Sequence, residues 1–118
     1  MRQIISSGSV KGFYIDREKV IVKLKEISER ALKIFPEILE IRVFGSFAKG
    51  EETGLSDLDI FILITGSEEK NPLERLKKYF YFFVDNIDIA VDVIVADLNE
   101  IKNFKDIISN SILITKRN

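Results

Sequence analysis

The sequence predicts an α/β (α+β) domain in which a small mixed β-sheet is covered by helices. Apolar residues recur at helical spacing over residues 16–35 and 71–85. Apolar runs of strand length occupy residues 40–44, 58–65 and 87–96, and helices or a glycine-rich turn separate them. Strands that are interleaved with helices in this way favour a mixed sheet with helices packed against it.

Length and composition restrict the possible functions. A chain of 118 residues is expected to form a single domain over residues 1–118, with residues 1–15 as an N-terminal extension of unpredicted structure. The chain contains no cysteine and no histidine, which excludes thiolate and imidazole chemistry. Any catalysis must therefore use carboxylates, Lys or Arg, hydroxyls and a bound cofactor.

The distribution of charge and apolar residues predicts a cytoplasmic protein that does not bind nucleic acid directly. The formal net charge is −1, and Lys and Arg never occur in runs longer than a pair. No apolar run is long enough to span a bilayer, and the N-terminus lacks the apolar core of a signal peptide. No association with membranes is expected.

Boundary residues mark both long helices. The first helix has Asp16 as its N-cap and Pro36 as its stop. In the second, Asn71 is the expected N-cap, Pro72 takes the first helical position, and Glu74 stands where a capping box needs it.

The apolar stripes of these helices predict which faces are buried. The expected stripes are Val20, Leu24, Ile27, Ala31 and Ile34 in the first helix, and Leu73, Leu76, Phe80 and Phe83/Val84 in the second. The aromatic run 79–83 is expected to pack in the core, with Tyr81 or Phe82 as candidates for a partner surface.

The central stretch of the chain predicts a strand, a glycine-bounded turn over 45–54 and a second strand. Gly45 and Ser46 lie where the first strand ends. Asp57 and Asp59 stand at the start of the second strand, and residues two apart on a strand point to the same side. The chain after Asp59 is apolar without alternation, which indicates a strand covered on both faces.

The acidic residues indicate a divalent metal. Two acids at the mouth of a buried strand are unfavourable unless a cation meets them. A third acid, Asp92, is expected mid-strand among apolar residues, where a buried carboxylate needs a partner or a metal. Carboxylate oxygens suit Mg²⁺ or Mn²⁺ better than softer metals. Beyond this strand, a short helix over 97–108 and a last strand over 111–115 are expected.

A glycine–serine pair and three acids together form a pattern that resembles the nucleotidyltransferase superfamily typified by DNA polymerase beta. The residues are Gly45, Ser46, Asp57, Asp59 and Asp92. The motifs G-S-F-A-K-G and S-D-L-D-I and the short length are similar to its smallest branch, the minimal nucleotidyltransferases (MNT), which are encoded beside HEPN-domain partners in prokaryotes. The resemblance covers residue 16 to the C-terminus and implies the polymerase beta-like nucleotidyltransferase fold.

The resemblance implies the metal ligands. Asp57 and Asp59 would bridge two Mg²⁺ or Mn²⁺ ions, which neutralise charge on the attacking and leaving oxygens. Asp92 would complete this site and help to activate the acceptor hydroxyl. All three acids are thus expected to be both catalytic and metal-binding.

The resemblance also implies how ATP is held. The Gly45 amide and the Ser46 hydroxyl would hold the β- and γ-phosphates, with Lys49 assisting. The family commonly has Arg at the position of Lys49, and Lys keeps the charge but lacks the bidentate guanidinium.

The function implied by the resemblance is metal-dependent transfer of AMP from ATP to a hydroxyl. The acceptor would be a tyrosine of a partner HEPN toxin, which makes this chain the antitoxin. Two alternatives stay open, namely a small-molecule nucleotidyltransferase, such as one acting on an aminoglycoside, and an antitoxin that acts by contact without catalysis. The three acids argue against the contact-only alternative, because a pure binder gains nothing from clustered carboxylates.

Overall fold

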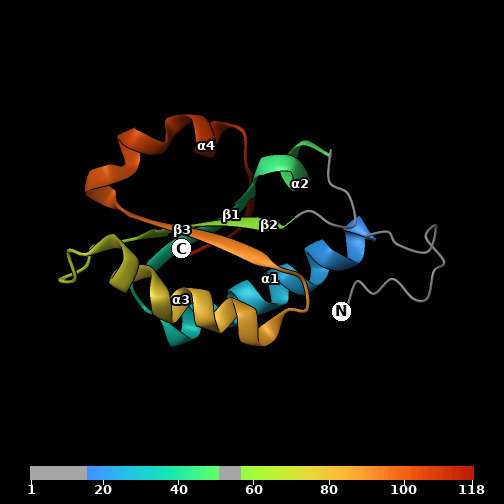
Figure 1. The fold of residues 1–118 in the computed structure, drawn as a ribbon, viewed down its shortest axis with the longest axis horizontal. Helices are drawn as coiled ribbons and strands as arrows, with labels where there is room; N and C mark the ends of the chain where they lie inside the picture. Colours follow the sequence, from blue (N-terminus) through green and yellow to red (C-terminus); the bar gives the residue numbers. More distant parts are fainter. Residues whose placement is uncertain (1–15, 51–56) are drawn as a thin grey trace.

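The computed structural model describes residues 16–50 and 57–118, which form one four-stranded sheet with its helices (Figure 1). The strands are β1 (Ile38–Phe44), β2 (Leu58–Ile64), β3 (Val91–Asp97) and β4 (Ile112–Lys116). Their order in the sheet is β3-β2-β1-β4, with β2 parallel to β3 and β1 antiparallel to β2 and β4. The predicted mixed sheet is confirmed. The predictions for residues 1–15 and for residues 51–56 of the turn lie outside the described residues.

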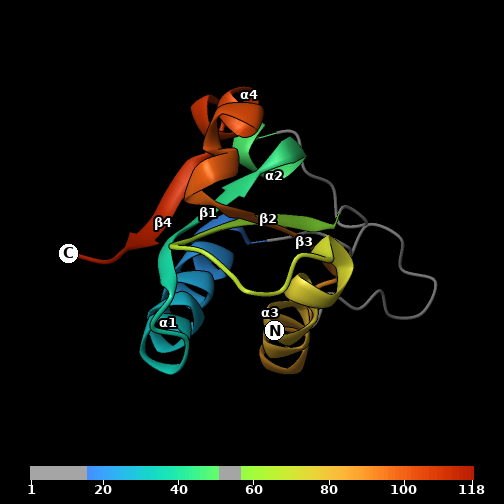
Figure 2. The ribbon, with the colours of Figure 1, turned by 90° about the vertical axis from the view of Figure 1, so that its left-hand side faces the viewer.

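Helices cover both faces of the sheet. They are α1 (Arg17–Ile34), α2 (Gly45–Lys49), α3 (Pro72–Asn86), the 3₁₀-helix η2 (Leu98–Phe104) and α4 (Lys105–Ser109). Figure 2 shows α1 and α3 on one side of the sheet and α2 and α4 on the other. We call these sides the α1/α3 face and the α2/α4 face.

Strand β2 is buried on both faces, as its apolar sequence predicts. Ile60, Ile62 and Ile64 are fully buried in the core between the sheet and the α1/α3 layer. Phe61 and Leu63 alternate with them and belong to a second, smaller core with residues of η2 and α4. The alternation assigns each neighbouring position of β2 to one face.

Helix α1 follows the prediction closely. The Asp16 side chain caps it by accepting a hydrogen bond from the Lys19 amide at 3.3 Å. The predicted apolar residues are buried except Ile34, which is exposed in the last turn. The helix ends where the Phe35 amide bonds to the Ala31 carbonyl, directly before Pro36.

The buried face of α3 differs from the prediction. Arg75, Tyr79 and Phe83 are buried, whereas Leu73 and Val84 of the predicted stripe are exposed. The prediction was right for Phe83 and wrong for Leu73 and Val84, because a stripe drawn from apolar residues alone leaves out Arg75. A buried ion-pair partner for this side chain exists only in the folded structure.

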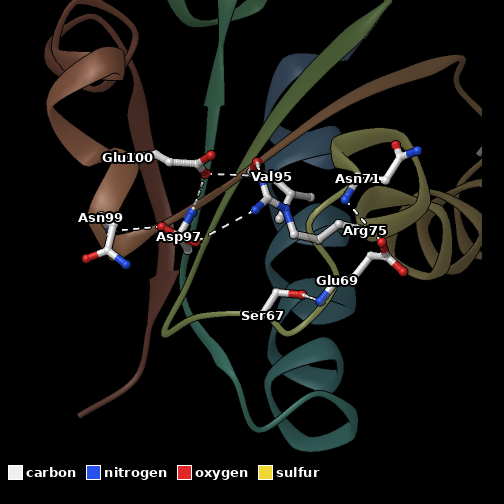
Figure 3. Close-up of polar contacts among 8 residues, drawn as sticks. All are labelled: Ser67, Glu69, Asn71, Arg75, Val95, Asp97, Asn99 and Glu100. Carbon is white, nitrogen blue, oxygen red and sulfur yellow. Dashed lines mark hydrogen bonds and ion pairs between the residues drawn. The ribbon is translucent and has the colours of Figure 1, made fainter.

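The N-terminus of α3 is capped by Asn71 as predicted. Its side-chain oxygen accepts hydrogen bonds from the amides of Leu73 at 2.9 Å and Glu74 at 3.4 Å. The predicted capping box is not formed by Glu74, which pairs with Lys77 at 2.8 Å. The Glu69 carboxylate instead accepts the Asn71 amide at 3.0 Å (Figure 3).

Strand β3 begins later than predicted. It starts at Val91, so residues 87–90 precede the strand. Asp92 is therefore the second residue of the strand and is exposed, and the expectation of a buried mid-strand acid was wrong. The predicted helix over 97–108 is a 3₁₀-helix followed by one short α-helix, and Asp97 caps it through a capping box with Glu100.

Arg75 links α3 to the far end of β3 (Figure 3). Its guanidinium donates to the Val95 carbonyl at 3.3 Å and to the Glu100 carboxylate at 3.0 Å, and it lies 3.7 Å from the Asp97 carboxylate. This cluster joins the α1/α3 layer to η2 on the other face. The two acids compensate the cost of burying the guanidinium.

We predict that Arg75→Ala lowers the free energy of unfolding by about 3 kcal/mol, because it leaves Asp97 and Glu100 without their cation. The control is Lys77→Ala, which breaks the exposed pair with Glu74 and should cost less than about 1 kcal/mol. Denaturant unfolding measures both values. Equal effects of the two substitutions would contradict the assigned role of Arg75.

A second polar cluster ties α3 to the start of β1. Glu37 accepts hydrogen bonds from the Tyr79 hydroxyl and, at 2.8 Å, from the Lys78 ammonium. Burial alone raises the pKa of Glu37, but the hydrogen bonds from Lys78 and Tyr79 outweigh it and hold the pKa below the usual 4.5. The unfolded state therefore binds more protons between the two pKa values, and stability rises with pH there.

We predict that Glu37→Gln lowers the free energy of unfolding at pH 7 by about 1 kcal/mol, the typical net value of such hydrogen bonds. The difference from wild type should shrink as the pH falls below 4.5 through the folded-state pKa. Thermal unfolding at several pH values tests this, with the exposed Glu26→Gln as a control. A deficit that is unchanged at pH 3 would refute the linkage.

Candidate active site

Gly45 and Asp59 lie against each other where β1 ends and β2 begins. Gly45 follows β1 with a φ of 74°, a left-handed conformation that favours glycine. A Cβ atom at Gly45 would lie 2.1 Å from Oδ2 of Asp59. The Asp59 carboxylate therefore rests directly on the backbone of Gly45, and only glycine fits there.

Asp59 and Asp92 are neighbours across the parallel pair β2–β3. They are register partners in the two strands, so their side chains project from the same face. Phe61 and Ile94, two residues further along each strand, pack in the core under η2 and α4. The two acids therefore stand on the α2/α4 face, just beyond that core.

The charges of two of the predicted acids act on the third, Asp59. Burial, and then the charges of Asp92 and Asp57, raise the pKa of the Asp59 carboxyl. Asp57 lies immediately before β2 and is exposed. The Leu58 amide donates to the Ala90 carbonyl at 2.8 Å, which joins the starts of β2 and β3. The fold thus brings Asp57, Asp59 and Asp92 to one end of the sheet.

The predicted turn after β1 begins as the short helix α2. Phe47 anchors it in the core, and the Arg17 guanidinium lies 4.5 Å from the Phe47 ring centroid and donates to the Phe47 carbonyl. Gly50 ends it with a φ of 75°. The turn prediction was wrong over 45–49, because the anchoring of Phe47 depends on contacts with α1 that are distant in sequence.

Ser46 and Lys49 lie on α2, next to Gly45. Ser46 is half-buried and Lys49 is exposed. A cleft of about 210 Å³ separates α2 from α4, and its lining residues are Phe44, Gly45, Lys49, Asp106, Ile107 and Asn110. The sequence contained no signal for Asp106 and Asn110, which reach this cleft only because α4 folds back over the sheet.

The donor atoms fit a hard divalent cation only in part. Carboxylate oxygens are the ligands that Mg²⁺ and Mn²⁺ prefer. Within residues 16–50 and 57–118, however, no three acidic side chains are grouped closely enough to hold a metal by themselves. A cation at Asp59 and Asp92 would therefore need further ligands, such as water and phosphate oxygens.

Comparison with known proteins identifies the class of this chain. The nucleotidyltransferase domain family matches residues 24–115, which is most of the chain, and the protein belongs to this family. The predicted family and fold are thereby confirmed, and the protein is a nucleotidyltransferase. No curated protein gives a significant match to the sequence.

Solved structures share this fold. A candidate nucleotidyltransferase from Sulfolobus solfataricus is 33% identical with a TM-score of 0.64, over 86% of this chain and 84% of that one. A toxin–antitoxin structure with AMP-PNP is 20% identical with a TM-score of 0.50, over 88% of this chain and 76% of that one.

None of the helices in the described residues is long and apolar enough to cross a membrane.

We predict that Gly45→Ala destabilises the protein more than Gly50→Ala. Both glycines have a left-handed φ, which costs a side chain about 1–2 kcal/mol. A methyl group at Gly50 meets nothing within 4 Å, whereas at Gly45 it collides with Asp59. Denaturant unfolding of the two variants measures the difference.

The double variant Gly45→Ala/Asp59→Ala tests the cause. Because the carboxylate is removed, the double variant should lose less stability than Gly45→Ala, and its loss should be close to that of Gly50→Ala. If the second substitution gives no recovery, the contact between Gly45 and Asp59 does not limit residue size at this position.

Proposed function

We propose that this protein transfers AMP from ATP to the hydroxyl of a tyrosine in a partner HEPN toxin, and so acts as the antitoxin. The observation that supports the proposal best is the Asp59 carboxylate lying against Gly45, beside its register partner Asp92. A phosphate-binding backbone and a pair of carboxylates are thereby adjacent. Nucleotidyl transfer needs groups that hold the phosphates next to carboxylates that hold a metal ion.

In this proposal α2 holds the triphosphate. The Gly45 amide is proposed to donate to a phosphate oxygen, while the Asp59 carboxylate takes the space that a side chain at Gly45 would fill. The Ser46 hydroxyl donates a second hydrogen bond, and the exposed Lys49 ammonium neutralises phosphate charge. These groups orient ATP so that its α-phosphorus faces the acids.

The proposed metal ligands are Asp57, Asp59 and Asp92, completed by phosphate oxygens. A bound Mg²⁺ or Mn²⁺ supplies charge neutralisation on the phosphate oxygens. Burial, and then the charges of Asp92 and Asp57, raise the pKa of Asp59, and such a cation would offset the repulsion among the three carboxylates. We therefore expect weak metal binding alone and stronger binding together with ATP.

The transfer step makes and breaks one bond at phosphorus. The acceptor oxygen bonds to the α-phosphorus, and the bond from the α-phosphorus to the bridging oxygen of the β-phosphate breaks, so pyrophosphate leaves with that electron pair. A carboxylate oxygen of Asp92, exposed at the start of β3, is proposed to accept the hydroxyl proton. The products are AMP esterified to the acceptor and pyrophosphate.

Two facts support a protein acceptor. The toxin–antitoxin structure with AMP-PNP has a similar fold. The net charge of −1 does not favour a nucleic acid as acceptor, because strong binding to phosphates needs clustered Lys and Arg. We also propose a cytoplasmic location, because no apolar run of the sequence is long enough to span a bilayer and the N-terminus lacks the apolar core of a signal peptide.

We predict that wild-type protein with ATP and Mg²⁺ adds AMP to a tyrosine of a HEPN partner protein, as measured by mass spectrometry. Asp59→Asn or Asp92→Asn should lower the rate by about 100-fold or more, on the scale of other losses of electrostatic stabilisation. Ser46→Ala should lower it by about 10-fold or more, since one hydrogen bond to a charged phosphate is lost. Asp59→Asn should remain folded, because it removes repulsion.

The matched control is Glu26→Gln, an exposed acid on α1 that should leave the rate unchanged. Calorimetry gives a separate test, because Asp57→Asn/Asp59→Asn should weaken binding of ATP with Mg²⁺. Equal neutralisation of the partner by wild type and Asp59→Asn, with no mass change in either case, would instead establish the contact-only antitoxin. Transfer to an aminoglycoside but not to the partner would establish the small-molecule enzyme.

A further inference from the structure

The cleft between α2 and α4 is lined by both apolar and polar side chains. Phe44 and Ile107 are half-buried, and both pack against the smaller core of the sheet. Lys49, Asp106 and Asn110 line the same cleft and are exposed, so a ligand can reach them. Small-molecule sites combine apolar surface with a few placed polar groups in this way. The cleft therefore has the composition of a site for a partly apolar ligand.

The Asp106 carboxylate is an unused hydrogen-bond acceptor in this cleft. Within residues 16–50 and 57–118 it makes no hydrogen bond and no ion pair, although Lys49 lines the same cleft. An ionised carboxylate can only accept hydrogen bonds, so a ligand beside it must present an N–H or O–H group. The same charge repels a phosphate. Asp106 thus favours a neutral ligand group that carries a donor.

Asn110 adds a side-chain amide that is held in place about one helical turn away. Its Nδ2 atom donates to the Asp106 carbonyl at 2.8 Å, which fixes the orientation of the amide. Nδ2 carries two hydrogens, and this bond uses one of them. Residues four apart on a helix are neighbours on its surface. The cleft thus offers an acceptor from Asp106 and a donor from Asn110 side by side.

An adenine base matches this set of groups. Its amino group donates, and a ring nitrogen beside that group accepts. The faces of the ring are suited to contact with apolar side chains such as Phe44 and Ile107. The cleft volume of about 210 Å³ is below the range of about 300–1,000 Å³ of pockets that hold a whole drug-sized ligand. The cleft is therefore suited to one part of a nucleotide.

The cleft is continuous with the candidate active site. Gly45 lines the cleft, and its backbone lies against the Asp59 carboxylate. Lys49, which also lines the cleft, belongs to the helix that is proposed to hold the triphosphate. A base in the cleft would therefore lie next to the point where the α-phosphate meets the acids.

We propose that the cleft between α2 and α4 binds the adenine base of the nucleotide, with Asp106 accepting from its amino group and Asn110 donating to a ring nitrogen. The two residues then determine which nucleotide binds. That the bound nucleotide is the one whose AMP is transferred rests on the proposed function. Recognition of the base does not require transfer.

The test compares ATP with purine riboside 5′-triphosphate, which differs from ATP only by lacking the amino group. Calorimetry with Mg²⁺ measures the binding of both compounds to wild type and to Asp106→Ala. Wild type should bind ATP about 10-fold more tightly, as expected for one hydrogen bond to a charged group. Asp106→Ala should lose this preference, and the four affinities form a cycle that isolates the contact.

Asn110→Ala is an independent second variant. It should weaken the binding of both compounds by about 5-fold, because both keep the ring nitrogen that accepts from the amide. The matched controls are Asp85→Ala on α3 and Asn103→Ala on η2, which are exposed and lie outside the cleft. Both should keep the preference for ATP.

Thermal unfolding of each variant separates recognition from stability. Asp106 lies in the first turn of α4, where an acid favours the helix, and a loss of that effect changes the melting temperature but not the preference between two ligands. Equal binding of ATP and the purine compound by wild type would overturn the proposal. A preference for ATP that persists in Asp106→Ala, or tighter binding of GTP than of ATP, would also overturn it.

Transfer assays with the same two triphosphates distinguish this proposal from the proposed function. If the preference for ATP depends on Asp106 in calorimetry but no nucleotide is transferred to any acceptor, base recognition stands and the proposed function fails. If wild type transfers both nucleotides to a partner protein with the same KM, base recognition fails and the proposed function stands.

Discussion

Strand β2 is kept from water on both faces, and the arrangement of the other elements follows from this constraint. Its odd and even positions pack into two different cores, so helices are required on each side of the sheet. Its two neighbours, β1 and β3, satisfy both of its backbone edges. Within the described residues its N-terminal end remains open, and there the alternation of side chains places Asp59 on the α2/α4 face, outside the core. The candidate site therefore lies where the smaller core stops, two residues before Phe61 and Ile94.

The two layers of helices have different tasks. The layer of α1 and α3 encloses the larger core, whereas α2, η2 and α4, among the residues that the structure describes, do not cover the end of their face where the acids lie. Arg75 joins the two layers through Asp97 and Glu100 at the opposite end of β3. The rigid end and the open end of β3 are thus separated by the length of one strand. This separation allows a charged, open site to exist without loosening the sheet.

Much of the candidate site was predictable because its signals are local. Gly45, Ser46 and the Asp57–Asp59 pair lie close together in sequence, and strand periodicity alone places both acids on one side. The parallel register that sets Asp92 beside Asp59 cannot be obtained from periodicity, since no local rule aligns two strands separated by a helix. Asp106 and Asn110 gave no signal at all, because their position depends on the return of α4 over the sheet.

The sequence by itself determined the mixed sheet, the caps of α1 and α3, the burial of β2 and the chemistry available to a chain without cysteine or histidine. Apolar periodicity and capping are local properties, so these features follow from short stretches. Only the tertiary structure decided that Arg75 is buried and that Val84 is exposed. Both outcomes turn on one partner, the acidic pair at the end of β3, which compensates the burial of a guanidinium. That pair holds Arg75 on the buried face of α3, and Leu73 and Val84 of the same helix are exposed.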